Sequence, residues 1–190
     1  MTPVLPRWFH QTLQDLIEMA GALAAEWMLL GAVPVSYYGW PRATTDLDFA
    51  LALDVSASDP VDRWMAGRGF SKKFGPSEIQ KKGIWLSKYW KELEQDTVGI
   101  DVFFSVGEWQ SKALERRVAA EVAGNSWWIP SLEDLILYKL IAYREKDILD
   151  LEGIWDRSLG KIDWRYLDPW IARLGLEADL PEIRETYGGA

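Results

Sequence analysis

The segment RATTDLDFALALD, residues 42–54, is the part of this chain that most constrains its fold. In an extended backbone, successive side chains point to opposite faces, so every second residue has the same surroundings. The odd-numbered positions are large and apolar: Leu47, Phe49, Leu51 and Leu53. The even-numbered positions begin with two carboxylates and continue with small residues: Asp46, Asp48, Ala50 and Ala52. The pattern predicts a core strand over 46–53 whose other face begins with two neighbouring acids.

A third carboxylate lies within a second predicted strand, TVGIDVFFS at residues 97–105. If the two strands are neighbours, Asp101 meets Asp46 and Asp48, and the repulsion among three carboxylates raises their pKa values. A divalent cation would relieve this repulsion, and hard oxygen ligands favour Mg²⁺ or Mn²⁺. Two such ions about 3.5–4 Å apart support phosphoryl transfer. The alternative is structural: Asp46 caps a loop and Asp48 lies at a solvated strand end.

The residues before the acidic strand favour the functional interpretation. Gly31 ends a short apolar run and precedes a short helix or turn at 32–39. Glycine at such a junction permits close approach of a phosphate to backbone N–H groups at a helix N-terminus. Arg42, Thr44 and Thr45 add a cation and two hydroxyls, a combination that suits a triphosphate with its metal ions.

Lys139 is a further candidate because it interrupts an apolar stripe. The stripe follows the three- and four-residue spacing of a helix: Leu132, Leu135, Ile136, Leu140 and Tyr143. Either the stem of Lys139 is buried while its ammonium reaches water, or the ammonium points into the site and neutralises phosphate charge. Asp147 continues the same helical face and would pair with Lys139 or orient it.

Periodicity and turn residues predict the remaining elements. Helices are expected over 11–27, 59–69, 109–122 and 131–156, the last opening at Ser131 with a capping-box-like start. Short strands are expected at 28–31 and 126–130, with a hairpin over 71–90. This order predicts an α/β fold: a small, mixed and twisted sheet flanked by helices, with a C-terminal helical extension. We expect a single unit over 1–190, with a core of about 11–130 and an extension of about 131–190.

Charge and composition narrow the function. The net charge of −8 gives no global attraction to nucleic acid or anionic membrane. The absence of cysteine excludes thiol chemistry, and the single histidine excludes sites that need a histidine pair. With no secretory signal and no membrane-length apolar run, we expect a cytoplasmic protein with no membrane partner. The hairpin lysines either form a local basic surface for RNA or a nucleotide, or protect strand edges: Lys72, Lys73, Lys81, Lys82 and Lys88.

These motifs resemble the nucleotidyltransferase superfamily, whose signature is a glycine followed by Gly or Ser, then D-x-D/E, with a third acid on a later strand. The chain is most similar to small AbiEii-type toxin-like nucleotidyltransferases. Their pattern, GG-x-A…G-x-x-R-x-T-x-D-I-D, is matched by Gly31, Gly39, Arg42, Thr45, Asp46 and Asp48. Their second motif, a lysine followed by a basic residue and aspartates, is matched by Lys139, Arg144, Asp147 and Asp150. The chain departs from the signature at Ala32, where Gly or Ser is usual.

The resemblance implies a Mg²⁺- or Mn²⁺-dependent enzyme that moves an NMP from an NTP to a hydroxyl acceptor. The acceptor would be tRNA or protein, in a toxin–antitoxin or phage-defence system with a cognate toxin or antitoxin partner. The implied metal ligands are Asp46, Asp48 and Asp101, which form the catalytic set together with Lys139. The implied nucleotide-binding residues are Gly31, Ala32, Ser36, Arg42, Thr45 and Lys139. Because Ala32 has no hydroxyl, the alternative is a catalytically silent protein of this fold, either an antitoxin-like partner or a nucleotide-binding module.

Overall fold

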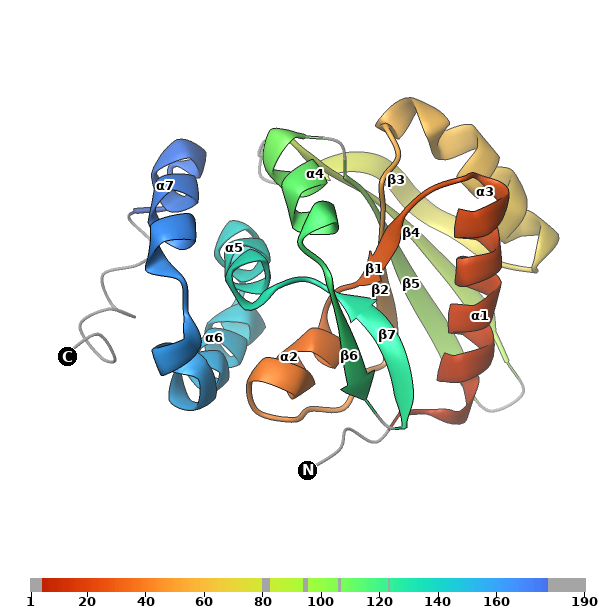
Figure 1. Cartoon of the computed structure of the whole chain (residues 1–190). Coiled ribbons are helices and arrows are strands. Elements are labelled where there is room, and N and C mark those ends of the chain that lie inside the picture. Colours follow the sequence, from red (N-terminus) through yellow and green to blue (C-terminus); the bar gives the residue numbers. More distant parts are fainter. Residues whose placement is uncertain (1–4, 80–82, 94–95, 106, 123, 178–190) are drawn as a thin grey trace.

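A computed structural model describes residues 5–79, 83–93, 96–105, 107–122 and 124–177 of the 190-residue chain. The predictions for Lys81, for Lys82 and for the helical chain beyond residue 177 lie outside these residues. The centre is a five-stranded mixed sheet of order β1-β2-β5-β4-β3 (Figure 1). Its strands are β1 (Trp27–Leu29), β2 (Asp46–Leu51), β3 (Ser71–Ile79), β4 (Ile84–Glu92) and β5 (Thr97–Phe104). The sheet, with its flanking helices, confirms the predicted α/β class.

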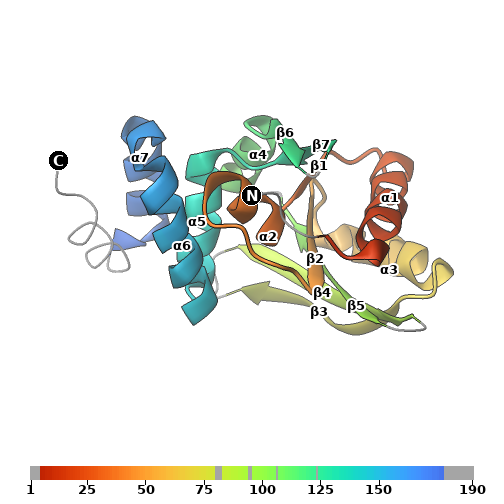
Figure 2. The same ribbon diagram turned by 90° about the horizontal axis from the view of Figure 1, so that it is seen from below.

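Helices cover both faces of this sheet. Helices α1 (Arg7–Ala22) and α3 (Ser58–Gly67) lie on one face, at the right of Figure 1. Helices α5 (Leu132–Ala142), α6 (Glu145–Ser158) and α7 (Trp164–Leu174) stand together on the other side, as Figure 2 also shows. The short α2 (Ala32–Tyr38) lies between the sheet and this group. In the described part of the chain, no helix combines the length and the apolarity that crossing a membrane requires.

The residues of β2 alternate between the two faces of the sheet, as the sequence pattern predicts. Strand β2 runs parallel to β5, and the remaining neighbours in the sheet are antiparallel. Leu47 and Phe49 are buried in the core beneath α1, while Ala50 belongs to the core on the opposite face. The acidic positions of β2 therefore share the face that looks toward α5, as alternation predicts.

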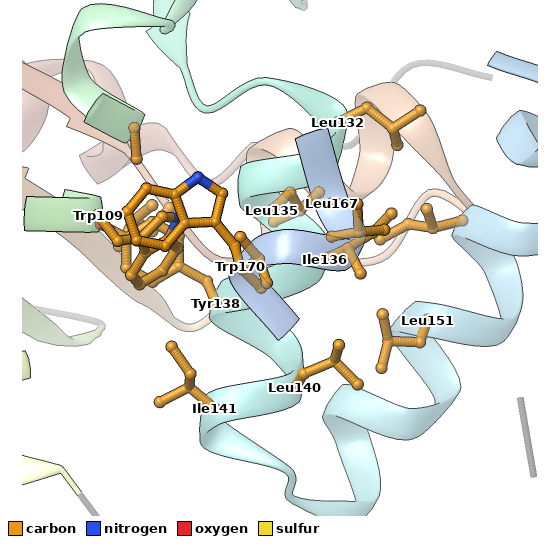
Figure 3. Close-up of a cluster of buried hydrophobic side chains, with 14 of the residues drawn as sticks. Trp109, Leu132, Leu135, Ile136, Tyr138, Leu140, Ile141, Leu151, Leu167 and Trp170 are labelled. Atoms are coloured by element: carbon orange, nitrogen blue, oxygen red, sulfur yellow. The ribbon is translucent and has the colours of Figure 1, made fainter. Parts of the chain in front are cut away.

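Helix α5 is apolar around most of its circumference because it lies between the sheet and the outer helices. Leu135 and Tyr138 point toward the sheet side, whereas Leu140 approaches Leu151 of α6 and Leu132 and Ile136 lie near Leu167 of α7 (Figure 3). A helix hydrophobic on nearly every side is stable only when it is buried in this way. Ser131 begins the helix as predicted, since its hydroxyl accepts a hydrogen bond from the Asp134 N–H.

Three of the predicted helices differ from those in the structure. The helix predicted over 109–122 is a short helix, α4 (Glu108–Glu115), followed by β6 (Val118–Val122), which pairs with β7 (Asn125–Ile129). Tertiary pairing outweighs helical spacing here, because Ala120 and Val122 alternate into the core as strand residues. The helix predicted over 131–156 divides at Tyr143, which has a φ of 41°, and α1 spans 7–22 instead of 11–27.

Two glycines let α2 and α6 meet through their backbones. A β-carbon on Gly153 would lie 2.9 Å from the backbone nitrogen of Trp40, and one on Gly39 would lie 2.9 Å from that of Ile154. The Ser158 hydroxyl donates to the Tyr38 carbonyl at 2.8 Å and fixes this contact. The contact holds the helical extension against the segment that leads into the acidic strand.

We predict that Gly153→Ala lowers the free energy of unfolding by about 1–3 kcal/mol, because the added methyl group has no space against Trp40. Thermal or urea unfolding measures this change. Gly21→Ala is the matched control, since a β-carbon at this helical glycine would meet nothing within 4 Å. Equal stability of the two variants would contradict the proposed close packing of α2 on α6.

Candidate active site

The parallel pairing of β2 with β5 brings the predicted carboxylates together. Asp48 is the direct partner of Asp101 across the two strands, and Asp46 is the partner of Gly99. Directly paired residues project from the same face of a sheet. The structure therefore places Asp46, Asp48 and Asp101 on one face of two adjacent strands, as the sequence predicts.

The electrostatics of this cluster show that the acids act on one another. Burial, followed by the charges of Asp101 and Asp46, raises the pKa of Asp48 to about 6. Burial also raises the pKa of Asp101, although the ammonium of Lys88 opposes the rise. Carboxylates with raised pKa values in one enclosed place are typical of functional sites, because their repulsion is relieved only by a bound cation or proton.

Lys88 from β4 neutralises one member of the cluster. It is the cross-strand partner of Asp101, and its Nζ lies 2.6 Å from the Oδ2 of that carboxylate. Asp46 accepts a hydrogen bond of 2.8 Å from the Thr45 hydroxyl instead. Within the described ranges, no three Cys, His, Asp or Glu side chains form a group that could hold a metal ion in this arrangement. Protein groups thus contact two of the three carboxylates, Asp101 and Asp46.

Gly31 is required by the position of Asp48. Its φ of 67° is one that residues with a β-carbon rarely adopt, and a β-carbon there would lie 1.8 Å from the Oδ2 of Asp48. We predicted that Gly31 leaves room for a phosphate; in the structure, the Asp48 carboxylate occupies the space that a side chain at position 31 would fill. Any larger residue at position 31 would displace Asp48 from its place.

A cavity of about 210 Å³ opens beside the carboxylates, between the sheet and α5. Its inner wall is apolar and includes Leu86, Phe103, Leu135 and Tyr138. Asp48 and Asp101 lie at its charged side, together with five cationic side chains: Arg42, Lys88, Lys139, Arg144 and Lys146. An apolar cavity with convergent charged groups is the usual form of a small-molecule site.

Lys139 is buried in a network of ion pairs at the edge of this cavity. Its Nζ lies 2.8 Å from Asp147 Oδ1 and 2.6 Å from Asp150 Oδ2. Arg42 Nε lies 3.0 Å from the other oxygen of Asp150, and Arg144 Nε lies 2.6 Å from that of Asp147. Burial alone would raise the pKa of Asp147, but the Arg144 and Lys139 partners outweigh it and lower the pKa. The predicted pairing of Lys139 with Asp147 is confirmed, across two helices instead of along one.

The structure divides the predicted nucleotide-binding residues. Gly31, Arg42 and Lys139 line the cavity with the carboxylates. Thr45 lies on the other side of Asp46, next to a separate groove. Two predicted residues, Ala32 and Ser36, are buried in α2, and among the described residues neither belongs to the cavity wall. The Ser36 hydroxyl accepts a hydrogen bond from the Arg42 backbone N–H at 3.3 Å, which leaves it a role in shaping the loop.

Two cations of the site were absent from the predicted set of site residues. The sequence shows Lys88 as one of several hairpin lysines, yet strand alternation places it in phase with Ile84 and Leu86, which face the core. A lysine in phase with buried positions was the signal available in the sequence. Lys146 has no ion-pair partner among the described residues, although its charge lowers the pKa of both Asp48 and Asp101.

The fold is similar to those of solved nucleotidyltransferase-like proteins. A candidate nucleotidyltransferase from Thermotoga maritima aligns with 79% of this chain and 94% of its own, at 15% identity and a TM-score of 0.51. An antigenic nucleotidyltransferase-like protein from Paracoccidioides brasiliensis aligns with 90% and 89%, at 15% identity and 0.51. The antibiotic-resistance factor ANT(2'')-Ia aligns with 92% and 95%, at 12% identity and 0.51. These likenesses establish a nucleotidyltransferase fold for this chain. Neither the protein-family models nor the curated proteins give a match to the sequence.

We predict that Asp48→Asn stabilises the metal-free protein near pH 8. Because the pKa of Asp48 is raised to about 6, its contribution to stability is fully present below its unfolded pKa and is lost as pH rises through 6. Asparagine stays neutral at every pH. The melting temperature of the variant should therefore be a few degrees above that of the wild type near pH 8 and equal to it below about pH 4. Melting temperatures across this pH range, with a chelator present, measure the effect.

Glu121→Gln, at an exposed position of β6, removes the same charge far from the cluster and is the matched control. A gain for Asp48→Asn that is independent of pH, or a loss near pH 8, would contradict the repulsion within the carboxylate cluster.

Proposed function

We propose that this protein is a Mg²⁺-dependent nucleotidyltransferase that transfers an NMP from an NTP to a hydroxyl acceptor. The observation that carries the proposal is the pairing of Asp48 with Asp101 at the charged side of a cavity lined by five cationic side chains. The nucleotidyltransferase fold supports the same chemistry. The resemblance to AbiEii-type proteins extends the proposal to tRNA or protein as acceptor, in a toxin–antitoxin or phage-defence system.

The chemistry of the three carboxylates suits a hard divalent cation, although the described side chains would have to draw closer together to hold one. Asp46, Asp48 and Asp101 offer carboxylate oxygens only, which are the ligands that Mg²⁺ and Mn²⁺ prefer. The raised pKa of Asp48 reflects uncompensated negative charge that a cation would relieve. When bound, such ions would neutralise the carboxylates and make the α-phosphorus of the NTP easier to attack.

Other residues of this chain would bind phosphate, accept a proton and position the site. In this proposal Lys146, which lines the cavity, is exposed and has no ion pair in the described part of the chain, would bind phosphate oxygens. In this proposal Asp101, whose pKa is raised by burial, would accept the proton of the acceptor hydroxyl. Lys139 acts in this proposal as a positioning residue that holds Asp147 and Asp150, and through Asp150 the Arg42 side chain.

The alternative is a catalytically silent nucleotide-binding or antitoxin-like protein of the same fold. Two observations favour it: the ammonium of Lys88 already pairs with Asp101, and Ala32 lacks the usual hydroxyl or glycine. Both proposals require the same cavity. They differ in whether a metal ion can displace Lys88 from the carboxylate.

Incubation with each α-³²P-labelled NTP and Mg²⁺ or Mn²⁺, with total RNA and total protein as acceptors, tests the enzyme. We predict transfer by the wild type and a loss of about 100-fold or more in Asp48→Asn. Since this variant should be the more stable one near pH 8, unfolding would not explain its loss. Glu121→Gln should transfer at the wild-type rate. Metal-dependent NTP binding without transfer would contradict the enzyme and support the silent protein.

A further inference from the structure

The outer face of helix α6 presents apolar side chains that the proposed function leaves without a role. Leu149 of this helix is 60% exposed, and Trp40, which follows α2, is 47% exposed. The two are neighbours, because the Trp40 ring lies against Gly153, one helical turn beyond Leu149. Isolated apolar residues are ordinary on a protein surface, so it is the adjacency of these two that needs an explanation.

The Trp40 ring is fixed in its exposed position. Its Nε1 donates to Asp156 Oδ2 at 3.0 Å, and its Cγ and Cδ2 atoms lie 3.0 Å from the place that a β-carbon on Gly153 would take. Glycine is unfavourable inside a helix, yet here it provides the space that the ring needs. An exposed aromatic side chain that is already ordered loses little conformational freedom on binding, which is typical of the residues that dominate interfaces.

The solvent face of α6 around Leu149 is acidic. Residues spaced by three or four positions share one face of a helix, and on this face they are Glu145, Leu149, Glu152 and Asp156. Of the two basic residues of α6, Lys146 lines the cavity and Arg157 donates to the Gly39 carbonyl at 2.6 Å. No described residue forms an ion pair with any of the three acids. The face is therefore an apolar centre with a negative surround.

We propose that this α6 face, together with Trp40, is a docking site for a basic amphipathic helix of a partner protein. Apolar side chains of the partner would cover Leu149 and Trp40, and flanking Lys or Arg side chains would pair with the three acids. The acidic face extends over about 16 Å, or three helical turns. A helix fits it better than an extended segment, because α6 uses its own backbone groups and offers none with which a strand could pair.

Charge argues against the other occupants. A second copy of this chain, packed through the same face, would bring the acids of both copies together. Nucleic acid and an anionic membrane surface would be repelled by these acids and by the net charge of −8. A basic partner would be attracted by both.

The docking site borders the ion pairs beside the cavity without belonging to the cavity wall. Trp40 lies two residues before Arg42, and Leu149 directly precedes Asp150, whose Oδ1 is 3.0 Å from Arg42 Nε. Neither Trp40 nor Leu149 is among the described residues that line the cavity. The inference therefore goes beyond the proposed function and does not depend on nucleotide transfer.

Fluorescence anisotropy of a labelled synthetic peptide, with the full chain as its partner, tests the docking site. The probe has about 15 residues, with leucines on one helical face and lysines elsewhere. We expect Leu149→Ala to weaken binding about tenfold, because the apolar centre is lost. Leu93→Ala is the matched control, since Leu93 is also exposed but directly follows β4.

The charge of the docking site has its own test. Glu152→Gln should weaken binding of the same peptide about threefold at low salt and very little at high salt. Glu121→Gln, which removes the same charge from β6, should leave the affinity unchanged.

Equal affinity of Leu149→Ala and Leu93→Ala for the peptide would overturn the docking site, as would equally tight binding of a peptide with glutamate in place of lysine. Sedimentation of the chain without peptide tests the second copy, and a dimer that Leu149→Ala dissociates would overturn the basic partner in favour of self-association. Because these assays contain no nucleotide, their outcome leaves the proposed function untouched.

Discussion

Repulsion among the carboxylates that the parallel pairing of β2 with β5 brings together is the constraint on which the rest of the site depends. Asp48 faces Asp101 in register. Burial, with the charges of Asp101 and Asp46, raises the pKa of Asp48, and burial, with the charge of Asp46, raises that of Asp101. Gly31 must lack a side chain because the Asp48 carboxylate occupies that space. Lys88 lies opposite Asp101 on the next strand and supplies one compensating charge. Holding these acids together opposes folding, because burial and like charge both disfavour their ionised forms, and the Lys88 ammonium offsets only part of this cost at Asp101.

The helical extension is joined to this cluster by charge as well as by apolar packing. Buried Lys139 holds Asp147 and Asp150 of the next helix, and Asp150 in turn meets Arg42 from the loop before β2. Separating one partner from such a buried network would leave an uncompensated buried charge. This cost favours the one arrangement of the helices and the loop in which all of the charges are paired. We infer that the network sets the distance between the helices and the acidic strand, and so sets the width of the cavity between them.

Much of the site could be predicted from the sequence, because alternation and spacing are local. The face of Asp46 and Asp48 followed from the period of two, and the place of Asp101 required only that two predicted strands be neighbours. The division of the predicted helix at Tyr143 could not be predicted, because the helical spacing of apolar residues continues past this position. The helix ends there because the backbone of Tyr143 is left-handed. The separation of the groove from the cavity was equally hidden. It depends on the pairing of Lys88 with Asp101, which is fixed by the register between two strands and not by either strand alone.

The proposed function requires that the carboxylates exchange the Lys88 ammonium for metal ions when a nucleotide binds. A crystal structure with Mn²⁺ and a non-hydrolysable NTP analogue, with the metal located by its anomalous scattering, tests it most directly. The account predicts Mn²⁺ against the carboxylates of Asp46, Asp48 and Asp101, with Lys88 released from Asp101. Nucleotide bound in the cavity while the Lys88–Asp101 pair stays intact and no Mn²⁺ touches Asp48 would contradict it.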